Sequence, residues 1–255
     1  MTARRQLDPT PPPPRWTAAA WRAFELGFRP WRRRRLDGVF LAGLPERLPS
    51  NTPVLVVANH TSWWDGFLVR EIHRRLRPHS PFYTIMLSQQ LRENRVLRWL
   101  GARGFTRGST SSLRALVKWL RERRGATPEA LFLFFPQGSL WPPDTRPLGF
   151  ARGMEGVARA LEPVVILPLG ICLSMGPNPS PRAFLHMGTP LSGSTSVGEV
   201  ERAVAAQLDL VREHLTRGGE RAEDLWPLDA TGTLARVAAS HPPESYSAEG
   251  EARPS

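Results

Sequence analysis

The feature that most constrains this chain is a short apolar run that passes at once into a polar turn and then into a helical pattern. Residues 53–58 are Pro-Val-Leu-Val-Val-Ala, which is typical of a buried strand. Residues 66–76 are predicted to be a helix, and the turn before them carries His60 and Asp65. In α/β sheets, binding and catalytic groups lie at the carboxyl ends of strands. The turn is therefore the first candidate site.

His60 and Asp65 have the residue types of a general base and the carboxylate that orients it. Five positions along a continuous helix are about 140° apart, so the two side chains meet only if the backbone bends between strand and helix. Asp65 would then accept a hydrogen bond from one imidazole nitrogen, and the other nitrogen would take a proton from a hydroxyl. This is the arrangement of a serine protease with the substrate's own alcohol in place of the serine. A structural or solvated pair is the alternative that these two residues alone leave open.

A second apolar run, residues 131–135, leads into Pro-Gln-Gly-Ser. Together with the stretch Asn59-His60-Thr61-Ser62-Trp63-Trp64-Asp65, it resembles the glycerophosphate and lysophospholipid acyltransferase family. The signature of that family pairs Asn-His-x-Ser-x-x-Asp with Phe-Pro-Glu-Gly-Thr-Arg, and here Gly138 follows His60 by 78 residues. Residues 101–107, 150–153 and 165–170 are similar to three weaker blocks of the family. The resemblance covers roughly residues 36–195 and is of the 1-acylglycerol-3-phosphate acyltransferase type.

The resemblance implies a role for each matching residue. His60 is the catalytic base and Asp65 its orienter. The implied substrate-binding residues are Arg107, Gln137, Gly138, Ser139 and Arg152, with Arg103 as a further candidate. A guanidinium binds phosphate through two parallel hydrogen bonds, which suits the arginines. Backbone N–H groups around Gly138 and Ser139 are candidates for stabilising an oxyanion.

Three positions depart from the family pattern, and all three lie in the second motif. Gln137 replaces Glu, Ser139 replaces Thr, and Leu140 replaces Arg. Glutamine keeps an acceptor oxygen but carries no charge, and leucine removes a cation. The departures therefore concern the acceptor site rather than the chemistry of His60.

Strands alternate with helices along the chain, which favours an α/β sheet covered by helices on both faces. The resemblance implies a mixed, mostly parallel sheet in one acyltransferase-like domain. Strands are predicted at residues 39–43, 53–58, 82–87, 131–135, 164–173 and 183–187, and helices at 17–28, 66–76, 88–99, 109–124, 153–161 and 197–216. The acyltransferase domain is predicted to span residues 36–217, and residues 218–255 to form a mostly disordered tail.

The first 35 residues are predicted to be a basic segment that is partly disordered and partly an amphipathic helix. Trp16, Trp21, Phe24 and Phe28 share one face of that helix, Pro30 is expected to end it, and residues 32–35 are four consecutive arginines. An aromatic helix beside a basic run is typical of an interfacial membrane anchor, and a helix packed on the core is the alternative. The sequence contains no run of about 18 apolar residues, so no membrane-spanning helix is predicted. The expected location is therefore peripheral, at the cytoplasmic face of the membrane.

Composition narrows the function classes. The net charge of +11 favours anionic partners such as phospholipid headgroups, but no zinc-finger, RNA-binding or basic coiled-coil pattern supports nucleic acid as a partner. No Gly-x-Ser-x-Gly motif supports a lipid esterase, and no cluster of residues predicts a metal site. The single cysteine, Cys172, lies in an apolar run and is expected to be inert.

These observations predict an acyltransferase that moves a fatty acyl group from a thioester to a lipid hydroxyl. The expected acceptor is 1-acylglycerol-3-phosphate in phospholipid synthesis. Another lysophospholipid or a glycosylated lipid is the alternative acceptor. The expected co-substrate is acyl-CoA or an acyl carrier protein thioester, with no cofactor. A catalytically silent, membrane-associated lipid-binding protein is the alternative outside the enzymes.

Overall fold

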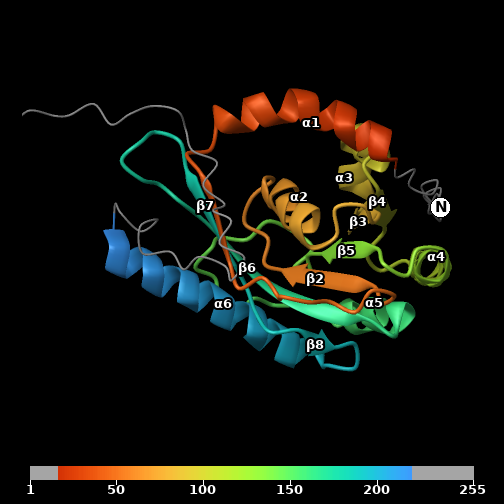
Figure 1. Ribbon diagram of the computed structural model, residues 1–255. Helices are drawn as coiled ribbons and strands as arrows, with labels where there is room; N and C mark the ends of the chain where they lie inside the picture. Colours follow the sequence, from red (N-terminus) through yellow and green to blue (C-terminus); the bar gives the residue numbers. More distant parts are fainter. Residues whose placement is uncertain (1–16, 220–255) are drawn as a thin grey trace, which may run out of the picture.

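The computed structural model describes residues 17–219, and Figure 1 shows how its elements are arranged. Predictions for residues 1–16 and 220–255 lie outside the described residues. These include Trp16 of the predicted aromatic face and nearly all of the predicted disordered tail.

The centre of the molecule is an eight-stranded sheet with the order β1-β7-β6-β2-β5-β3-β4, and β8 pairs with β6. β2 pairs in parallel with β5 and β6, β3 with β4 and β5, and β1 with β7, whereas β6 runs antiparallel to β7 and β8. The prediction of a mixed, mostly parallel α/β sheet is confirmed. The strands are β1 (Val39–Ala42), β2 (Val54–Ala58), β3 (Phe82–Leu87), β4 (Ala102–Phe105), β5 (Leu131–Phe134), β6 (Val165–Ser174), β7 (Arg182–Met187) and β8 (Leu191–Ser192).

Helices cover both faces of the sheet, because the central strands are apolar on both sides (Figure 1). Val56 of β2 belongs to a core with α1 and α2, while its neighbour Leu55 belongs to a second core with α4, α5 and α6. Side chains alternate between the two faces of a strand, so one short run supplies both cores. The helices are α1 (Ala18–Arg33), α2 (Asp65–Leu76), α3 (Ser88–Glu93), the 3₁₀ turn η1 (Arg95–Arg98), α4 (Thr110–Ala126), α5 (Gly153–Leu161) and α6 (Val197–Gly218).

The register of the sheet brings three chain segments to one edge. Val57 of β2 pairs with Phe134 of β5, which pairs in turn with Ile85 of β3. Leu87, at the end of β3, pairs with Phe105 at the end of β4. The segments that leave β2, β4 and β5 therefore start at the same edge of the sheet, although about 80 residues separate the first from the last in the chain.

Helix α1 does not end at Pro30 as predicted, but continues to Arg33. Trp31 stacks on Trp64 with 4.8 Å between ring centroids. Arg32 is buried and forms an ion pair with Glu71 of α2 at 3.6 Å. Proline removes one helical hydrogen bond and costs about 3 kcal/mol. These tertiary contacts hold the last turn in place despite that cost.

The aromatic face of α1 is turned towards the protein. Trp21 is buried and its indole N–H donates to the carbonyl oxygen of Leu100 at 3.1 Å. Phe24 stacks on Phe67 of α2, and the tilted ring of Phe28 contacts the same side chain with 4.5 Å between ring centroids. The contacts of these rings are those of a helix packed on the core. The division of the chain at residue 35 stays a prediction.

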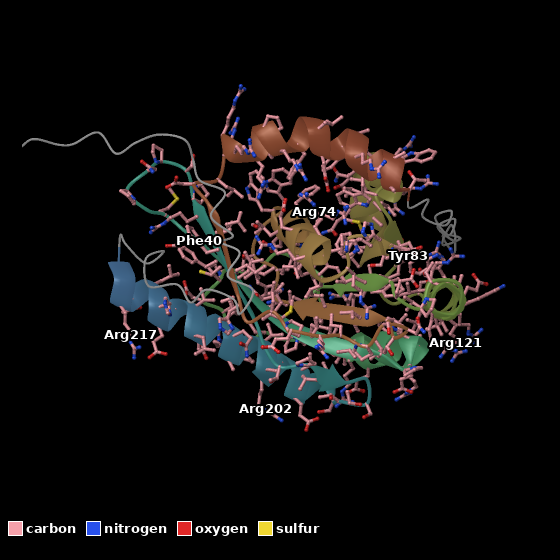
Figure 2. All side chains as sticks on the ribbon, in the orientation of Figure 1. Phe40, Arg74, Tyr83, Arg121, Arg202 and Arg217 are labelled. Atoms are coloured by element: carbon pink, nitrogen blue, oxygen red, sulfur yellow. The ribbon has the colours of Figure 1, made fainter. Side chains whose placement is uncertain are left out.

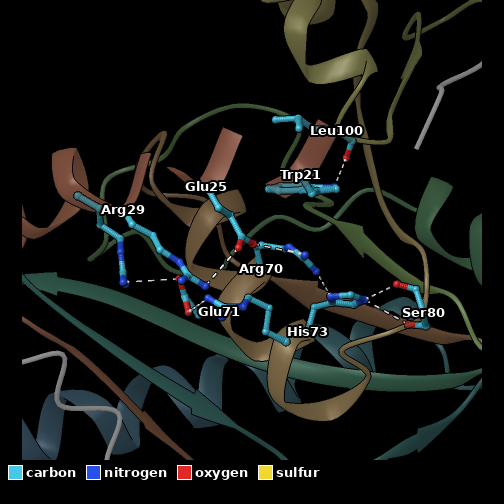
Figure 3. A network of polar contacts seen from close by, with 10 residues as sticks. Trp21, Glu25, Arg29, Arg70, Glu71, His73, Ser80 and Leu100 are labelled. Carbon is cyan, nitrogen blue, oxygen red and sulfur yellow. Dashed lines mark hydrogen bonds and ion pairs between the residues drawn. The ribbon is translucent and has the colours of Figure 1, made fainter. Parts of the chain in front are cut away.

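A polar network joins α1 and α2 beneath these rings (Figure 3). Arg70 forms an ion pair with Glu25 at 3.4 Å and also contacts Nδ1 of His73, whose Nε2 lies 3.0 Å from the carbonyl oxygen of Ser80. Burial, followed by the charge of Arg70, lowers the pKa of His73 to about 3. His73 is buried, and these contacts on both ring nitrogens are those of a structural residue.

The predicted helix over residues 88–99 is interrupted at Asn94. The backbone N–H of Asn94 and its side-chain amide both donate to the carbonyl oxygen of Gln90, which closes α3. A polar side chain that binds the backbone in this way competes with helix continuation. Strands β4 and β8 were not predicted, because both are short and Gly104 and Ser192 weaken their apolar patterns.

Basic side chains are distributed over the outside of the helices. Arg121, Arg202 and Arg217 are exposed and project outward from α4 and α6, whereas Phe40 and Tyr83 are buried on the face of the sheet that α4, α5 and α6 cover (Figure 2). The positive charge is therefore spread over the surface rather than confined to the arginine run after α1.

Candidate active site

The predicted convergence of His60 and Asp65 occurs in the structure. His60 Nδ1 lies 2.9 Å from Asp65 Oδ2, and Asp65 is fully buried. The same carboxylate oxygen accepts the backbone N–H groups of Thr61 at 2.8 Å and Ser62 at 2.9 Å. These donors fold residues 60–65 around the carboxylate and supply the bend that the spacing requires. With Asp65 as the acceptor, the neutral imidazole carries its proton on Nδ1 and is a base at Nε2.

Neighbouring strands fix the start of this turn. Asn59 is buried and its side-chain amide exchanges two hydrogen bonds of 2.8 Å with the backbone of Ile171 in β6. The imidazole of His60 stacks on Phe135, with 4.1 Å between ring centroids and 12° between the planes. Neither role was predicted, although both residues lie inside the stretches that were singled out.

The segment after β5 holds the backbone of His60 on both sides. Gln137 Oε1 accepts the His60 N–H at 2.6 Å, and the Trp141 N–H donates to the His60 carbonyl oxygen at 2.9 Å. Gln137 is buried, and its Nε2 donates to the carbonyl oxygen of Leu148 at 3.1 Å. Both ends of its side chain are thus used inside the protein, and it does not line the cavity beside His60.

Arg107, which follows the end of β4, contacts the segment after β5 that holds His60. Its Nη2 donates to the carbonyl oxygen of Gln137 at 3.3 Å. Gly138 has a φ of +71°, and a Cβ added there would lie 2.3 Å from Arg107 Nη2. The glycine therefore serves two needs: it adopts a left-handed turn and it leaves room for the guanidinium.

A cavity of about 1030 Å³ opens in front of His60. Its walls are mostly apolar or aromatic side chains from α1, β3, α4 and the segments after β4 and β5. Arg107 and Gly138 line it, as does Leu140 at the position where the family has arginine. A cavity of this size, with few polar groups beside a possible base, is typical of a site for a largely apolar ligand.

Other predicted residues lie outside the cavity wall. Ser139 and Arg152 are exposed and do not line it. Arg103 is buried with its guanidinium 5.9 Å from the ring centre of Trp119. The backbone N–H of Gly138 donates to the carbonyl oxygen of Phe135 at 3.1 Å, so this N–H is engaged in the turn rather than offered to an oxyanion.

Cys172 is buried, and burial raises the pKa of its thiol, which fits the expectation of an inert packing residue. Within residues 17–219, no group of three or more ligating side chains could hold a metal ion. In the same part of the chain, no helix combines the length and the apolar character needed to cross a membrane.

The His–Asp pair lies at the end of a central strand of the α/β sheet and faces a large apolar cavity, an arrangement that suits an enzyme with a general base. Residues 42–172 match the family model described as Acyltransferase, which is more than half of the chain. The protein belongs to this family and is an acyl-group transferase with a donor and an acceptor substrate.

Among solved structures, the chain is similar to the 1-acyl-sn-glycerophosphate (LPA) acyltransferase PlsC from Thermotoga maritima. The two share 20% sequence identity with a TM-score of 0.49, and the match covers 76% of each chain. No curated protein matches the chain.

Proposed function

We propose that the protein transfers a fatty acyl group from a thioester to the hydroxyl of 1-acylglycerol-3-phosphate in phospholipid synthesis. The observation that carries the proposal is the 2.9 Å contact between His60 and Asp65 at the wall of the apolar cavity. The donor is acyl-CoA or an acyl carrier protein thioester, and the protein works as a peripheral protein at the cytoplasmic face of a membrane. No cofactor is needed for this chemistry.

In the proposed mechanism, His60 Nε2 removes the proton of the acceptor hydroxyl while the oxygen attacks the thioester carbonyl. Asp65 holds the imidazole in the required tautomer and stabilises the imidazolium that forms. The C–S bond then breaks, the thiolate leaves, and the proton on His60 passes to it. The Gly138 N–H is engaged in its turn, so of the two predicted donors the Ser139 N–H, next to the cavity wall, is the remaining candidate for the oxyanion contact.

Arg107 is the proposed contact for the acceptor phosphate. It lines the same cavity as His60, and a guanidinium can bind phosphate with two hydrogen bonds. Arg152, which is exposed at the start of α5, is the second candidate.

A second candidate acceptor is supported by Leu140. This side chain is exposed and lines the cavity, so the wall is apolar where the family has a cation. One charge-assisted hydrogen bond contributes about 1.5–3 kcal/mol, or roughly ten- to a hundredfold in affinity. Another lysophospholipid or a glycosylated lipid carries less charge near the reacting hydroxyl than a phosphate monoester does. Such an acceptor would therefore lose less binding affinity from the missing cation.

A direct comparison of acceptors tests the proposal. The purified protein is given one acyl thioester and, in turn, lysophosphatidic acid, lysophosphatidylcholine, lysophosphatidylglycerol and a glycolipid. The specificity constant for lysophosphatidic acid should exceed the others if the first candidate is right. Leu140→Arg should shift the preference towards lysophosphatidic acid if the second is right. Absence of transfer to all of these acceptors would contradict both.

A further inference from the structure

The segment after β5 is fixed to helix α6 as well as to the catalytic turn. This segment, residues 135–152, holds the backbone of His60 near its start. Near its end, the carboxylate of Glu201 in α6 accepts two backbone N–H groups, from Gly149 at 2.9 Å and from Phe150 at 3.0 Å. Each oxygen of the carboxylate takes one N–H, and a hydrogen bond to an ionised acceptor is roughly twice as strong as a neutral one.

A single peptide unit connects these bonds to the catalytic turn. The carbonyl of Leu148 and the N–H of Gly149 belong to one planar trans peptide, so they point in opposite directions. The N–H donates to Glu201, and the carbonyl oxygen accepts from Gln137 Nε2 at 3.1 Å. Gln137 Oε1 accepts in turn from the His60 N–H at 2.6 Å. We call these three consecutive hydrogen bonds the hydrogen-bond path.

Burial allows the path to transmit a displacement. Gln137 and Leu148 are buried, and Glu201 is half-buried. A buried polar group that loses its partner has no water to replace it, and hydrogen bonds in a buried series strengthen one another. A shift of the peptide between Leu148 and Gly149 would therefore move Gln137 with it.

Two ion pairs also join α6 to this segment. Arg146 pairs with Asp209 at 2.9 Å and Arg212 pairs with Asp144 at 2.6 Å, and both aspartates are exposed. Exposed ion pairs contribute little to stability. The bonds of Glu201, in contrast, lead through one buried peptide towards the catalytic turn.

We propose that Glu201 is a positioning residue for acyl transfer, which acts through the hydrogen-bond path to set the place of His60 at the cavity wall. Glu201 does not line the cavity, so it is not itself a catalytic residue. It also lies outside residues 42–172, which match the family model, and outside both signature motifs. The inference rests on the proposed function in taking His60 as the base.

Glu201→Gln is the most conservative change that tests this role. The amide has the same size but one acceptor oxygen, so its NH₂ group would face the N–H of Gly149 or Phe150 and one bond would be lost. Glu213→Gln is the matched control, because Glu213 lies in the same helix and pairs with Arg217 of α6. Unfolding midpoints of the full-length variants show first that each is folded at the assay temperature.

Steady-state kinetics with one acyl thioester and one acceptor give the first readout. Glu201→Gln should lower kcat about tenfold with KM within about twofold, because a shift of less than 1 Å costs less than the roughly hundredfold expected for 1 Å. Glu213→Gln should match the wild type. In a Gln137→Met background, where the path is already broken, Glu201→Gln should change kcat by less than about twofold. The full loss in that background would overturn the proposal, because Glu201 would then act independently of Gln137.

Amide hydrogen exchange, followed by NMR without substrate, gives a readout that does not depend on activity. Glu201→Gln should speed exchange of the His60 N–H by about tenfold, because its bond to Gln137 opens more often, and Glu213→Gln should leave that rate unchanged. An unchanged rate at His60 in a folded Glu201→Gln protein would overturn the inference. Absence of acyl transfer by the wild type would instead contradict the proposed function, and the exchange rates would still decide whether Glu201 positions His60.

Discussion

Gln137 gives the sharpest test of how the site is held together. Its amide accepts from the His60 N–H at 2.6 Å and donates to the carbonyl oxygen of Leu148 at 3.1 Å. Gln137→Glu, which introduces the residue of the family signature, keeps the acceptor but loses the donor when the carboxyl is ionised. A buried carbonyl left without its donor costs about 1–3 kcal/mol, and burial of the charge adds to this. We expect the turn to shift, and a shift of about 1 Å in a catalytic base costs roughly a hundredfold in kcat.

The pH dependence of the loss in kcat distinguishes a positioning role of Gln137 from direct contact with substrate. A protonated carboxyl can donate to the Leu148 oxygen and accept from His60, so it mimics the amide of Gln137. Burial raises the pKa of a carboxyl above its usual value of about 4.3, so the protonated fraction grows as the pH falls towards that raised pKa. The ratio of Gln137→Glu to wild-type kcat should therefore rise as the pH falls from about 8 to about 5.5. Dividing by the wild-type value removes the pH dependence that the two proteins share.

Gln137→Met is the matched control, because it has similar volume but neither hydrogen bond. Its ratio to wild type should be low and constant across the same pH range. Steady-state kinetics with one thioester and one acceptor, at several pH values, would check both variants. A constant ratio for Gln137→Glu, or a loss confined to KM for the acceptor, would refute positioning and support the direct substrate contact expected from the sequence.

Three further outcomes are expected. His60→Ala should lower acyl transfer by roughly 10²–10⁴-fold with an unchanged unfolding midpoint, and Asp65→Asn should lose much of the rate through the wrong tautomer; near-wild-type turnover by a folded His60→Ala protein would rule out the base. Gly138→Ala should displace Arg107, since the new Cβ would lie 2.3 Å from its Nη2, and should raise KM for a phosphate-bearing acceptor; an unchanged KM would remove Arg107 from the acceptor site. His73 has a lowered folded pKa of about 3, so the stability that its neutral form contributes is complete above about pH 6.5 and is lost as the pH falls from there. The contribution of His73 to the free energy of unfolding falls by at most about 1.4 kcal/mol per pH unit. His73→Gln should remove this pH dependence in unfolding measurements at several pH values.

The aromatic face of α1 shows where a local pattern is ambiguous. The pattern of Trp21, Phe24 and Phe28 is the same whether the helix lies in a bilayer or on a protein core. The contacts with Leu100 and Phe67 favour the core, and neither partner is near α1 in the sequence. The stop predicted at Pro30 was wrong for the same reason, because distant contacts outweighed one lost hydrogen bond.

Local patterns were sufficient for the parts of this protein that depend on near neighbours in the chain. The apolar runs of β2 and β5 predicted buried strands, and the helices predicted over residues 109–124 and 197–216 correspond to α4 and α6. The sequence also predicted that His60 and Asp65 meet, because both lie in the short turn that follows a buried strand. Only the tertiary structure decided what surrounds them. The hydrogen bond from His60 to Gln137, the approach of Arg107 to Gly138 and the walls of the apolar cavity all join segments far apart in the chain, and such contacts depend on sheet register and packing rather than on local composition.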